Sequence, residues 1–203
     1  KNFKNYKYTI PNYDKKILIS EASLFCDWYA KKWSSKSIQK NFSKEFIKII
    51  KNLVSKIKLK NNVFVHRDFH VSNLMLVNGQ IGVIDSQDAL IGNKAYDLAS
   101  LVDDVRLKTS KSLKKKVFNY YLRKQKKLNL NKFKNDFEIL SVLRNLKIIG
   151  IFTRLAVRDK KKDYLKLIPY TWKLINIRIN ENKLFEDLRN LLNKNFKNKL
   201  NEN

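Results

Sequence analysis

This chain is poor in the residues that interrupt or cross-link a fold. Its 203 residues include four glycines, two prolines and one cysteine. A single cysteine excludes an internal disulfide framework, and so little glycine and proline leaves no flexible, low-complexity linker. The sequence has no run of about 18 or more uncharged apolar residues, and therefore predicts no membrane-spanning helix. We expect a protein of a reducing compartment, the cytoplasm.

Acidic residues are also scarce beside basic ones. The sequence has 44 lysines and arginines against 18 acidic residues, a formal net charge of +26. Such a balance can indicate a nucleic-acid or anionic membrane partner. The lysines, however, are spread along nearly every segment beside many asparagines and isoleucines, as in a chain biased toward A/T-rich codons. We therefore favour solvated lysine-rich surfaces over nucleic-acid binding, expect no membrane partner, and predict no particular oligomeric state.

The apolar pattern is that of one folded domain. Hydrophobic residues make up 43% of the chain and aromatic residues 12%, enough for a substantial core. Short strands early in the chain and helices elsewhere predict a mainly helical α+β domain. The predicted strands are 63–65, 74–77 and 80–84, and the predicted helices are 21–33, 42–57, 96–107, 113–121, 136–157, 165–175 and 184–192. Asn135 and Glu138 resemble a capping box at the start of the longest helix.

The most specific stretch of the chain is residues 65–73, Val-His-Arg-Asp-Phe-His-Val-Ser-Asn. It supplies a carboxylate, Asp68, and an amide five positions later, Asn73, and the second apolar run after it ends in another carboxylate, Asp85. Phosphoryl transfer to a hydroxyl uses this set, because one acid accepts the hydroxyl proton while an Asn and an Asp hold Mg²⁺ against a nucleoside triphosphate. We predict Asp68 as the catalytic base, Asn73 and Asp85 as Mg²⁺ ligands, and ATP as co-substrate.

An Asn-Gly dipeptide at 78–79 joins the two apolar runs that follow the motif. It favours a two-residue hairpin, because a type I′ turn needs positive φ at both central positions. That register places Asn73 beside Ile84, one residue from Asp85. Strict alternation would turn Asn73 and Asp85 to opposite faces, so we expect one of them to leave the ladder. The predicted catalytic groups then converge at the open end of one hairpin.

The two histidines of the chain, His66 and His70, flank the same loop. We interpret both as hydrogen-bonding supports that shape the loop. The sequence gives no support for zinc ligation, because Cys26 is distant in sequence and no second thiol exists.

These motifs together resemble a known group of enzymes. Residues 66–73, 84–85 (Ile-Asp) and 96–99 (Tyr-Asp-Leu-Ala) are similar to the aminoglycoside phosphotransferase and choline kinase superfamily, protein-kinase-like enzymes that act on small molecules. A helix follows the second carboxylate within about a dozen residues, too few for the activation segment of protein kinases. The resemblance implies the C-terminal lobe of a kinase-like fold at 21–203, preceded by a linker at 1–20 from a missing N-terminal lobe.

Within that superfamily, the chain most resembles bacterial cell-wall-recycling kinases that phosphorylate the anomeric hydroxyl of N-acetylmuramate and N-acetylglucosamine. Three further segments carry this likeness: 24–29, 87–89 and 145–155. The resemblance implies an ATP- and Mg²⁺-dependent phosphotransferase whose acceptor is the hydroxyl of an amino sugar.

The resemblance also implies roles for two further acids. Asp97 would be a buried acid that holds the catalytic loop through its backbone, and Asp88 would orient substrate or loop. Both residues are equally compatible with ordinary helix-cap or turn positions.

Two features depart from the family pattern. Ser86 follows Asp85 where the family has a large apolar residue, and no glycine-rich phosphate loop precedes residue 61. We therefore expect the isolated lobe to bind ATP poorly and to turn over slowly or not at all. An aminoglycoside- or choline-type kinase, or a degenerate kinase-like fold that only binds ligands, stay open as alternatives.

Overall fold

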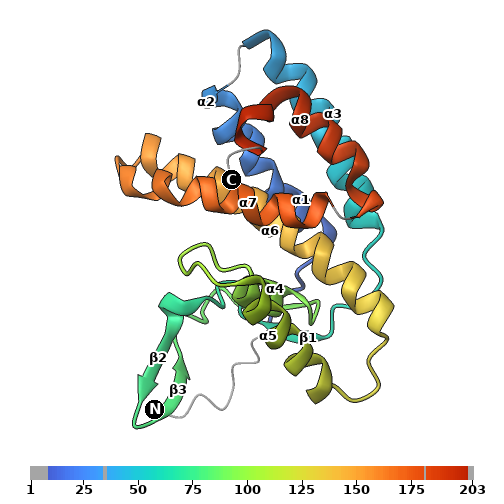
Figure 1. Ribbon diagram of the computed structural model, residues 1–203, viewed down its shortest axis with the longest axis vertical. Coiled ribbons are helices and arrows are strands. Elements are labelled where there is room, and N and C mark those ends of the chain that lie inside the picture. The colour runs from blue at the N-terminus through green and yellow to red at the C-terminus, as the bar shows by residue number, and fades with distance from the viewer. Residues whose placement is uncertain (1–8, 34–35, 181, 201–203) are drawn as a thin grey trace.

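Helix α6 (Leu130–Val157) is the element around which most others pack (Figure 1). The computed structural model describes residues 9–33, 36–180 and 182–200. Apart from α6, the helices are α1 (Lys15–Leu24), the π-helix η1 (Phe25–Ala30), α2 (Lys31–Trp33), α3 (Lys36–Ser55), the 3₁₀ helix η2 (Val71–Asn73), α4 (Tyr96–Val102), α5 (Lys111–Lys124), η3 (Lys162–Leu167), α7 (Ile168–Ile179), η4 (Lys183–Phe185) and α8 (Glu186–Leu200). The strands are β1 (Val63–Val65), β2 (Leu74–Val77), β3 (Gln80–Val83) and β4 (Leu90–Gly92). The predicted mainly helical α+β domain is confirmed.

Helix α6 is buried on most of its circumference, as a core helix rather than a surface helix is. It begins at Leu130, where the side chain of Asn129 accepts a hydrogen bond from the Lys132 N–H at 3.0 Å. The prediction of a start at 136 with a capping box is wrong. Asn135 lies inside the helix, and its amide donates to the Lys56 carbonyl instead. Among the described residues, none of the helices combines the length and hydropathy that a bilayer span needs.

Segment 15–33 runs as one helical stretch across α6, with a π-helical centre at η1. Gly150 makes this crossing possible. A Cβ atom built there would lie 2.4 Å from the main-chain carbonyl of Leu24. A larger residue at 150 would therefore force the two helices apart.

The first sheet pairs β1 with β4 in antiparallel register, Val63 opposite Gly92. The stretch before α1 joins this sheet, because the Tyr13 N–H donates to the Ile91 carbonyl and the Ile91 N–H donates to the Pro11 carbonyl, both at 2.8 Å. Tyr13 is only 2% exposed. Residues 11–20 therefore pack with the folded lobe, residues 1–8 of the predicted 1–20 linker lie outside the described residues, and a linker from an N-terminal lobe stays a prediction.

The second sheet is the hairpin of β2 and β3, which projects from the helical body (Figure 1). Val77 pairs with Gln80, and both turn residues at 78–79 have positive φ, 48° and 76°. The predicted two-residue turn and its register are confirmed. The apolar side chains of the hairpin remain exposed, with Leu76 at 73% and Ile81 at 64%.

Helix α4 is shorter than the predicted 96–107. The chain leaves the helix at Asp103, whose carboxylate accepts hydrogen bonds from Ser141 of α6 and from Arg178 of α7. A tertiary contact therefore overrides the apolar spacing that continues to Leu107.

Candidate active site

Asp68 lies in the loop between β1 and η2, with its backbone fixed and its side chain free. Its main-chain carbonyl accepts hydrogen bonds from the His70 N–H at 3.0 Å and from the Asn73 side-chain amide at 2.9 Å. Within the described part of the chain, the half-buried Asp68 carboxylate accepts no hydrogen bond and makes no ion pair. This carboxylate is therefore available to a ligand hydroxyl.

Asn73 and Asp85 meet at the open end of the hairpin. The Ile84 N–H donates to the Asn73 carbonyl at 3.1 Å, which extends the ladder by one pair beyond β2 and β3. Asn73 sits in η2, and Asp85 takes a left-handed φ of 70°, so both leave strand geometry. The Asn73 amide nitrogen then lies 3.5 Å from the Asp85 carboxylate and also contacts the carbonyl of Asp68. The structure thus brings the side chains of Asn73 and Asp85 together beside the main chain of Asp68.

The oxygen atoms at this place suit a hard cation. Since the Asn73 amide nitrogen is the donor in both contacts, its Oδ1 stays free of hydrogen bonds among the described residues. One Asp85 oxygen accepts from Gln87 at 2.8 Å, and the other has only the long contact to Asn73. No cluster of three or more His, Cys, Asp or Glu side chains in the described ranges could hold a metal. One amide and one carboxylate oxygen, completed by water, match the preference of Mg²⁺.

Asp97 holds the backbone at the start of the loop. Its carboxylate, at the first turn of α4, accepts the backbone N–H groups of His66 at 2.7 Å and Arg67 at 3.0 Å. Burial raises the pKa of Asp97, although the two N–H donors act to lower it. The carboxylate supports Arg67 in a left-handed conformation, φ 72°, that a non-glycine residue rarely adopts.

The two histidines differ in how they contact the loop. The His66 imidazole Nε2 donates to the Ile84 carbonyl at 2.9 Å, which joins the loop to the end of the hairpin. The buried His70 imidazole has an Nδ1 atom with no hydrogen-bond partner in the described part of the molecule. Burial lowers the pKa of His70, and the positive charge of Arg106 lowers it further.

The side chain of Arg67 is held by Glu21, a residue that the sequence analysis did not identify. The Arg67 guanidinium lies 2.5 Å from one Glu21 carboxylate oxygen, which also contacts the Lys147 ammonium at 2.9 Å, and the Tyr13 hydroxyl donates to the other. Burial acts to raise the pKa of Glu21, but Lys147, Tyr13 and Arg67 together lower it. Glu21 therefore joins α1, α6 and the loop in one buried network.

Asp88 contacts the loop through its backbone. Its carbonyl accepts a hydrogen bond from Nη1 of Arg67 at 2.9 Å, and the residue itself is exposed.

Asp104 is a second anchor that the sequence did not reveal. Its carboxylate accepts the Val71 N–H at 2.9 Å, just before Asn73. The available signal was an acid within or beside an apolar stripe, in a chain with 18 acidic residues. Asp97 and Asp104 both show this pattern.

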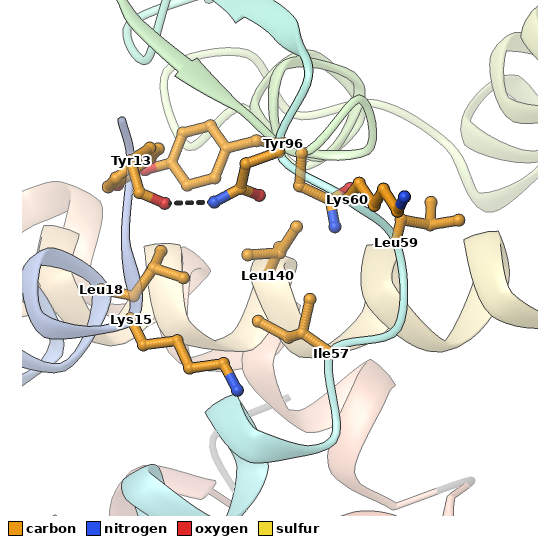
Figure 2. A pocket seen from close by; sticks show the side chains of 10 residues that line it. Tyr13, Lys15, Leu18, Ile57, Leu59, Lys60, Tyr96 and Leu140 are labelled. Carbon is orange, nitrogen blue, oxygen red and sulfur yellow. Dashed lines mark hydrogen bonds between the residues drawn. The ribbon is translucent and has the colours of Figure 1, made fainter. Parts of the chain in front are cut away.

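A cavity of about 250 Å³ lies apart from these residues, beside Tyr13 (Figure 2). Leu18, Ile57 and Leu140 form its apolar part. Two of its polar side chains are engaged in the fold, since the Asn61 amide donates to the Tyr13 carbonyl at 2.7 Å and the Asn93 amide donates to Asp136. The cavity lies between α1, the segment 57–61 that follows α3, and α6, and we assign no ligand to it.

Comparison with known proteins places this geometry in a family. A model of the phosphotransferase enzyme family matches residues 14–130, which contain the whole candidate site. The chain belongs to this family. The resemblance found in the motifs is thereby confirmed.

Relatives of known name agree. The chain is 34% identical over 166 residues to an N-acetylmuramate/N-acetylglucosamine kinase of Neisseria meningitidis serogroup B, an alignment that covers 79% of this chain and 50% of that kinase. It is 30% identical over 189 residues to the kinase of the same name from Pseudomonas aeruginosa, with 90% of this chain and 56% of the relative covered. A third such kinase, from Caulobacter vibrioides, is 32% identical over 120 residues.

The chain spans about half the length of the first two relatives and 33% of the third. This share, together with the helical fold and the position of the motifs, fits the C-terminal lobe of a protein-kinase-like enzyme.

Proposed function

We propose that this chain is the catalytic lobe of a kinase that transfers the γ-phosphoryl group of ATP to the anomeric hydroxyl of N-acetylmuramate or N-acetylglucosamine. The observation that carries the proposal is the carboxylate of Asp68, which has no partner among the described residues and whose main chain is bonded to Asn73 of the Asn73–Asp85 pair. The names of the relatives support the amino-sugar acceptor. An ATP-dependent reaction of this kind belongs in the cytoplasm.

In the proposed reaction, Asp68 accepts the proton of the acceptor hydroxyl across about 2.6–3.2 Å. The acceptor oxygen forms a bond to the γ-phosphorus, the bond from that phosphorus to the leaving oxygen breaks, and ADP departs with the electron pair. Asn73 Oδ1 and the Asp85 carboxylate would hold Mg²⁺, which when bound neutralises charge on the triphosphate. The proton ends on Asp68 and passes to water.

The surrounding contacts serve to keep these groups in place. Asp97 fixes the backbone at 66–67, and Glu21 fixes the Arg67 side chain. Catalysis of phosphoryl transfer depends mainly on such positioning and on electrostatic stabilisation. The net charge of +26 would also attract the anionic nucleotide, an effect that salt weakens.

The test is a transfer assay on the protein in its full natural length. ATP and Mg²⁺ are supplied with N-acetylmuramate, N-acetylglucosamine, choline and an aminoglycoside as separate acceptors. We expect phosphorylation of the amino sugars, and a rate about 10²- to 10⁴-fold lower in Asp68→Ala.

The matched control is Asp163→Ala, which removes an exposed carboxylate paired only with Lys166 and should leave the rate unchanged. Preferential transfer to choline or the aminoglycoside would replace the acceptor assignment. An unchanged rate in Asp68→Ala would contradict its role as the base.

A further inference from the structure

Arg144, on α6, is a buried cation without an acceptor. It is only 4% exposed, and its Nη1 atom is sealed from solvent. Within the described residues, its guanidinium makes no hydrogen bond and no ion pair. Because an unpaired buried charge is costly, an arginine in such a place indicates an anionic ligand.

The segment that follows α4 runs along α6 over Arg144. One turn before Arg144, Ser141 donates to Asp103 at 2.5 Å. Two turns after it, the ring of Phe152 lies 5.9 Å from the guanidinium of Arg106. Arg144 lies between these two contacts on the same helix, so Arg106 and Arg144 belong to one cluster.

This cluster adjoins the candidate catalytic loop. Asp104 accepts the Val71 N–H through one carboxylate oxygen, and the other lies 3.9 Å from the Arg106 guanidinium. Arg106 is therefore beside residues 70–71, two positions beyond Asp68. Its side chain is 29% exposed, so a ligand can reach it from solvent.

The charges of the cluster act on one another. After burial, the positive charges of Arg106 and Arg144 lower the pKa of His70, whereas Asp104 and Asp68 act to raise it. Burial and Arg144 lower the pKa of Arg106, whereas Asp104 and Asp68 act to raise it. The two arginines therefore share a field beside Asp68, and an anion between them would relieve their mutual repulsion.

The acidic side chains near this cluster have other roles. Asp97 accepts two backbone N–H groups, and Asp104 accepts those of Val71 and Arg106. Asp68 is the base of the proposed reaction. No carboxylate in the described part of the chain forms an ion pair with Arg144, although its positive charge acts from a longer distance to lower the pKa of Asp97.

We propose that Arg106 and Arg144 form an acceptor subsite that binds the carboxylate of an acidic amino sugar whose hydroxyl lies at Asp68. The inference rests on the proposed function and assigns the residues that distinguish one acceptor sugar from the other. N-acetylmuramate carries a carboxylate that N-acetylglucosamine lacks, and guanidinium groups match a carboxylate with paired, charge-assisted hydrogen bonds. The other anion at such a site is the transferring phosphoryl group, which is common to both sugars.

The experiment compares the two sugars in one variant series, again with the protein in its full natural length. Arg144→Met removes the charge while keeping a long side chain, and Arg106→Gln removes the exposed partner. We expect each to lower kcat/KM for N-acetylmuramate by about 10- to 100-fold, the size of a charge-assisted hydrogen bond. The value for N-acetylglucosamine should change by less than about threefold in each variant, since that sugar makes no such bond. Arg158→Gln, which removes an exposed charge paired only with Asp159, is the control and should change neither.

A stability readout separates binding from folding. Since Arg144 makes no bonds within the described protein, Arg144→Met should unfold at a temperature equal to or above that of the wild type. A selective loss for N-acetylmuramate at unchanged stability supports the subsite. Equal losses of kcat/KM with both sugars would assign the arginines to the phosphoryl group or to the fold, and would overturn the subsite. An unchanged preference for N-acetylmuramate over N-acetylglucosamine would overturn it as well.

Direct binding keeps the subsite testable apart from the proposed reaction. If the wild type phosphorylates neither sugar, the proposed function fails, and calorimetric titration decides the subsite. Tighter binding of N-acetylmuramate than of N-acetylglucosamine, abolished in Arg144→Met, supports it. Equal binding of both sugars, or binding of neither, overturns it.

Discussion

Two regions of this molecule differ in the burial of their apolar side chains. Helix α6 lies in the core, with apolar side chains buried on most sides, whereas the β2–β3 hairpin projects outward with its apolar side chains exposed (Figure 1). The candidate active site lies where the hairpin meets the helical body. The core therefore has to position the candidate catalytic groups on a segment that contributes little packing of its own.

It does so through buried acids that hold the main chain. The carboxylates of Asp97 and Asp104 accept hydrogen bonds from backbone N–H groups of the loop, whereas the Asp68 carboxylate has no hydrogen-bond partner among the residues that the structure describes. Stability and activity should for this reason be separable by mutation. We expect the core and its anchors to determine stability, and the loop side chains to determine activity.

The sharpest contrast between the regions is at their glycines. Gly150→Ala would place a Cβ 2.4 Å from the Leu24 backbone, whereas Gly82→Ala in the hairpin would meet nothing closer than 3.7 Å. We expect Gly150→Ala to lower the free energy of unfolding by about 3 kcal/mol through overpacking. Gly82→Ala should change it by about 0.5 kcal/mol or less. Urea unfolding measures both changes. Similar losses at the two positions would contradict the contrast between a tightly packed core helix and a loosely packed hairpin.

Glu21→Gln tests the anchor that joins the core to the loop. Removing its charge leaves Arg67 and Lys147 without their common partner, and we expect a loss of about 2–3 kcal/mol in the free energy of unfolding. Transfer activity should also fall, because Arg67 is no longer held.

The pH dependence of this variant has a definite sign. The folded pKa of Glu21 lies below its ordinary value of 4.5, so its contribution is present above pH 4.5 and is lost as pH falls through the folded pKa. The difference in stability between wild type and Glu21→Gln should shrink in that acid range. A difference that stays constant down to acid pH would show that the loss in Glu21→Gln does not come from the carboxylate charge.

Asp97→Asn should have a smaller effect on folding. The amide keeps the shape of the carboxylate but turns an NH₂ group toward one of the two backbone donors, His66 or Arg67. We expect a loss of about 1–2 kcal/mol in stability, as for one unsatisfied buried donor. The transfer rate should fall about tenfold or more, because a misplaced loop costs orientation. A variant with wild-type kinetics would show that the loop holds its conformation without this acid.

The smallest effect is expected on the hairpin surface. Leu76→Thr and Ile81→Thr replace exposed apolar side chains and should change the free energy of unfolding by less than about 0.5 kcal/mol. Leu146→Ala, in the core of α6, is the comparison and should cost about 2–5 kcal/mol. Thermal unfolding of the three variants measures these differences. A large loss of stability in Leu76→Thr or Ile81→Thr would show that the hairpin side chains contribute to packing.

Local chemistry explains which features the sequence predicted. The Asn-Gly turn fixes the hairpin register, so the sequence placed Asn73 beside Ile84 correctly. The start of α6 was missed because a cap at Asn129 competes with the predicted one at Asn135. Strand β4 was missed because its partners are distant in sequence.

The buried charges were the hardest to foresee. Glu21, Asp104 and Arg144 lie far apart in sequence, and only the packing of α1, α4 and α6 brings them to the loop. A single sequence shows a motif whose members are close together. It does not show the supports that tertiary structure supplies.

The proposed function requires Asn73 and Asp85 to bind one divalent cation beside Asp68. Paramagnetic broadening of backbone amide NMR signals by Mn²⁺ in the presence of ATP would detect this cation. We expect broadening at residues 66–73 and 84–87, abolished by Asp85→Asn and retained in Asp163→Asn. Broadening centred elsewhere, or unchanged in Asp85→Asn, would contradict it.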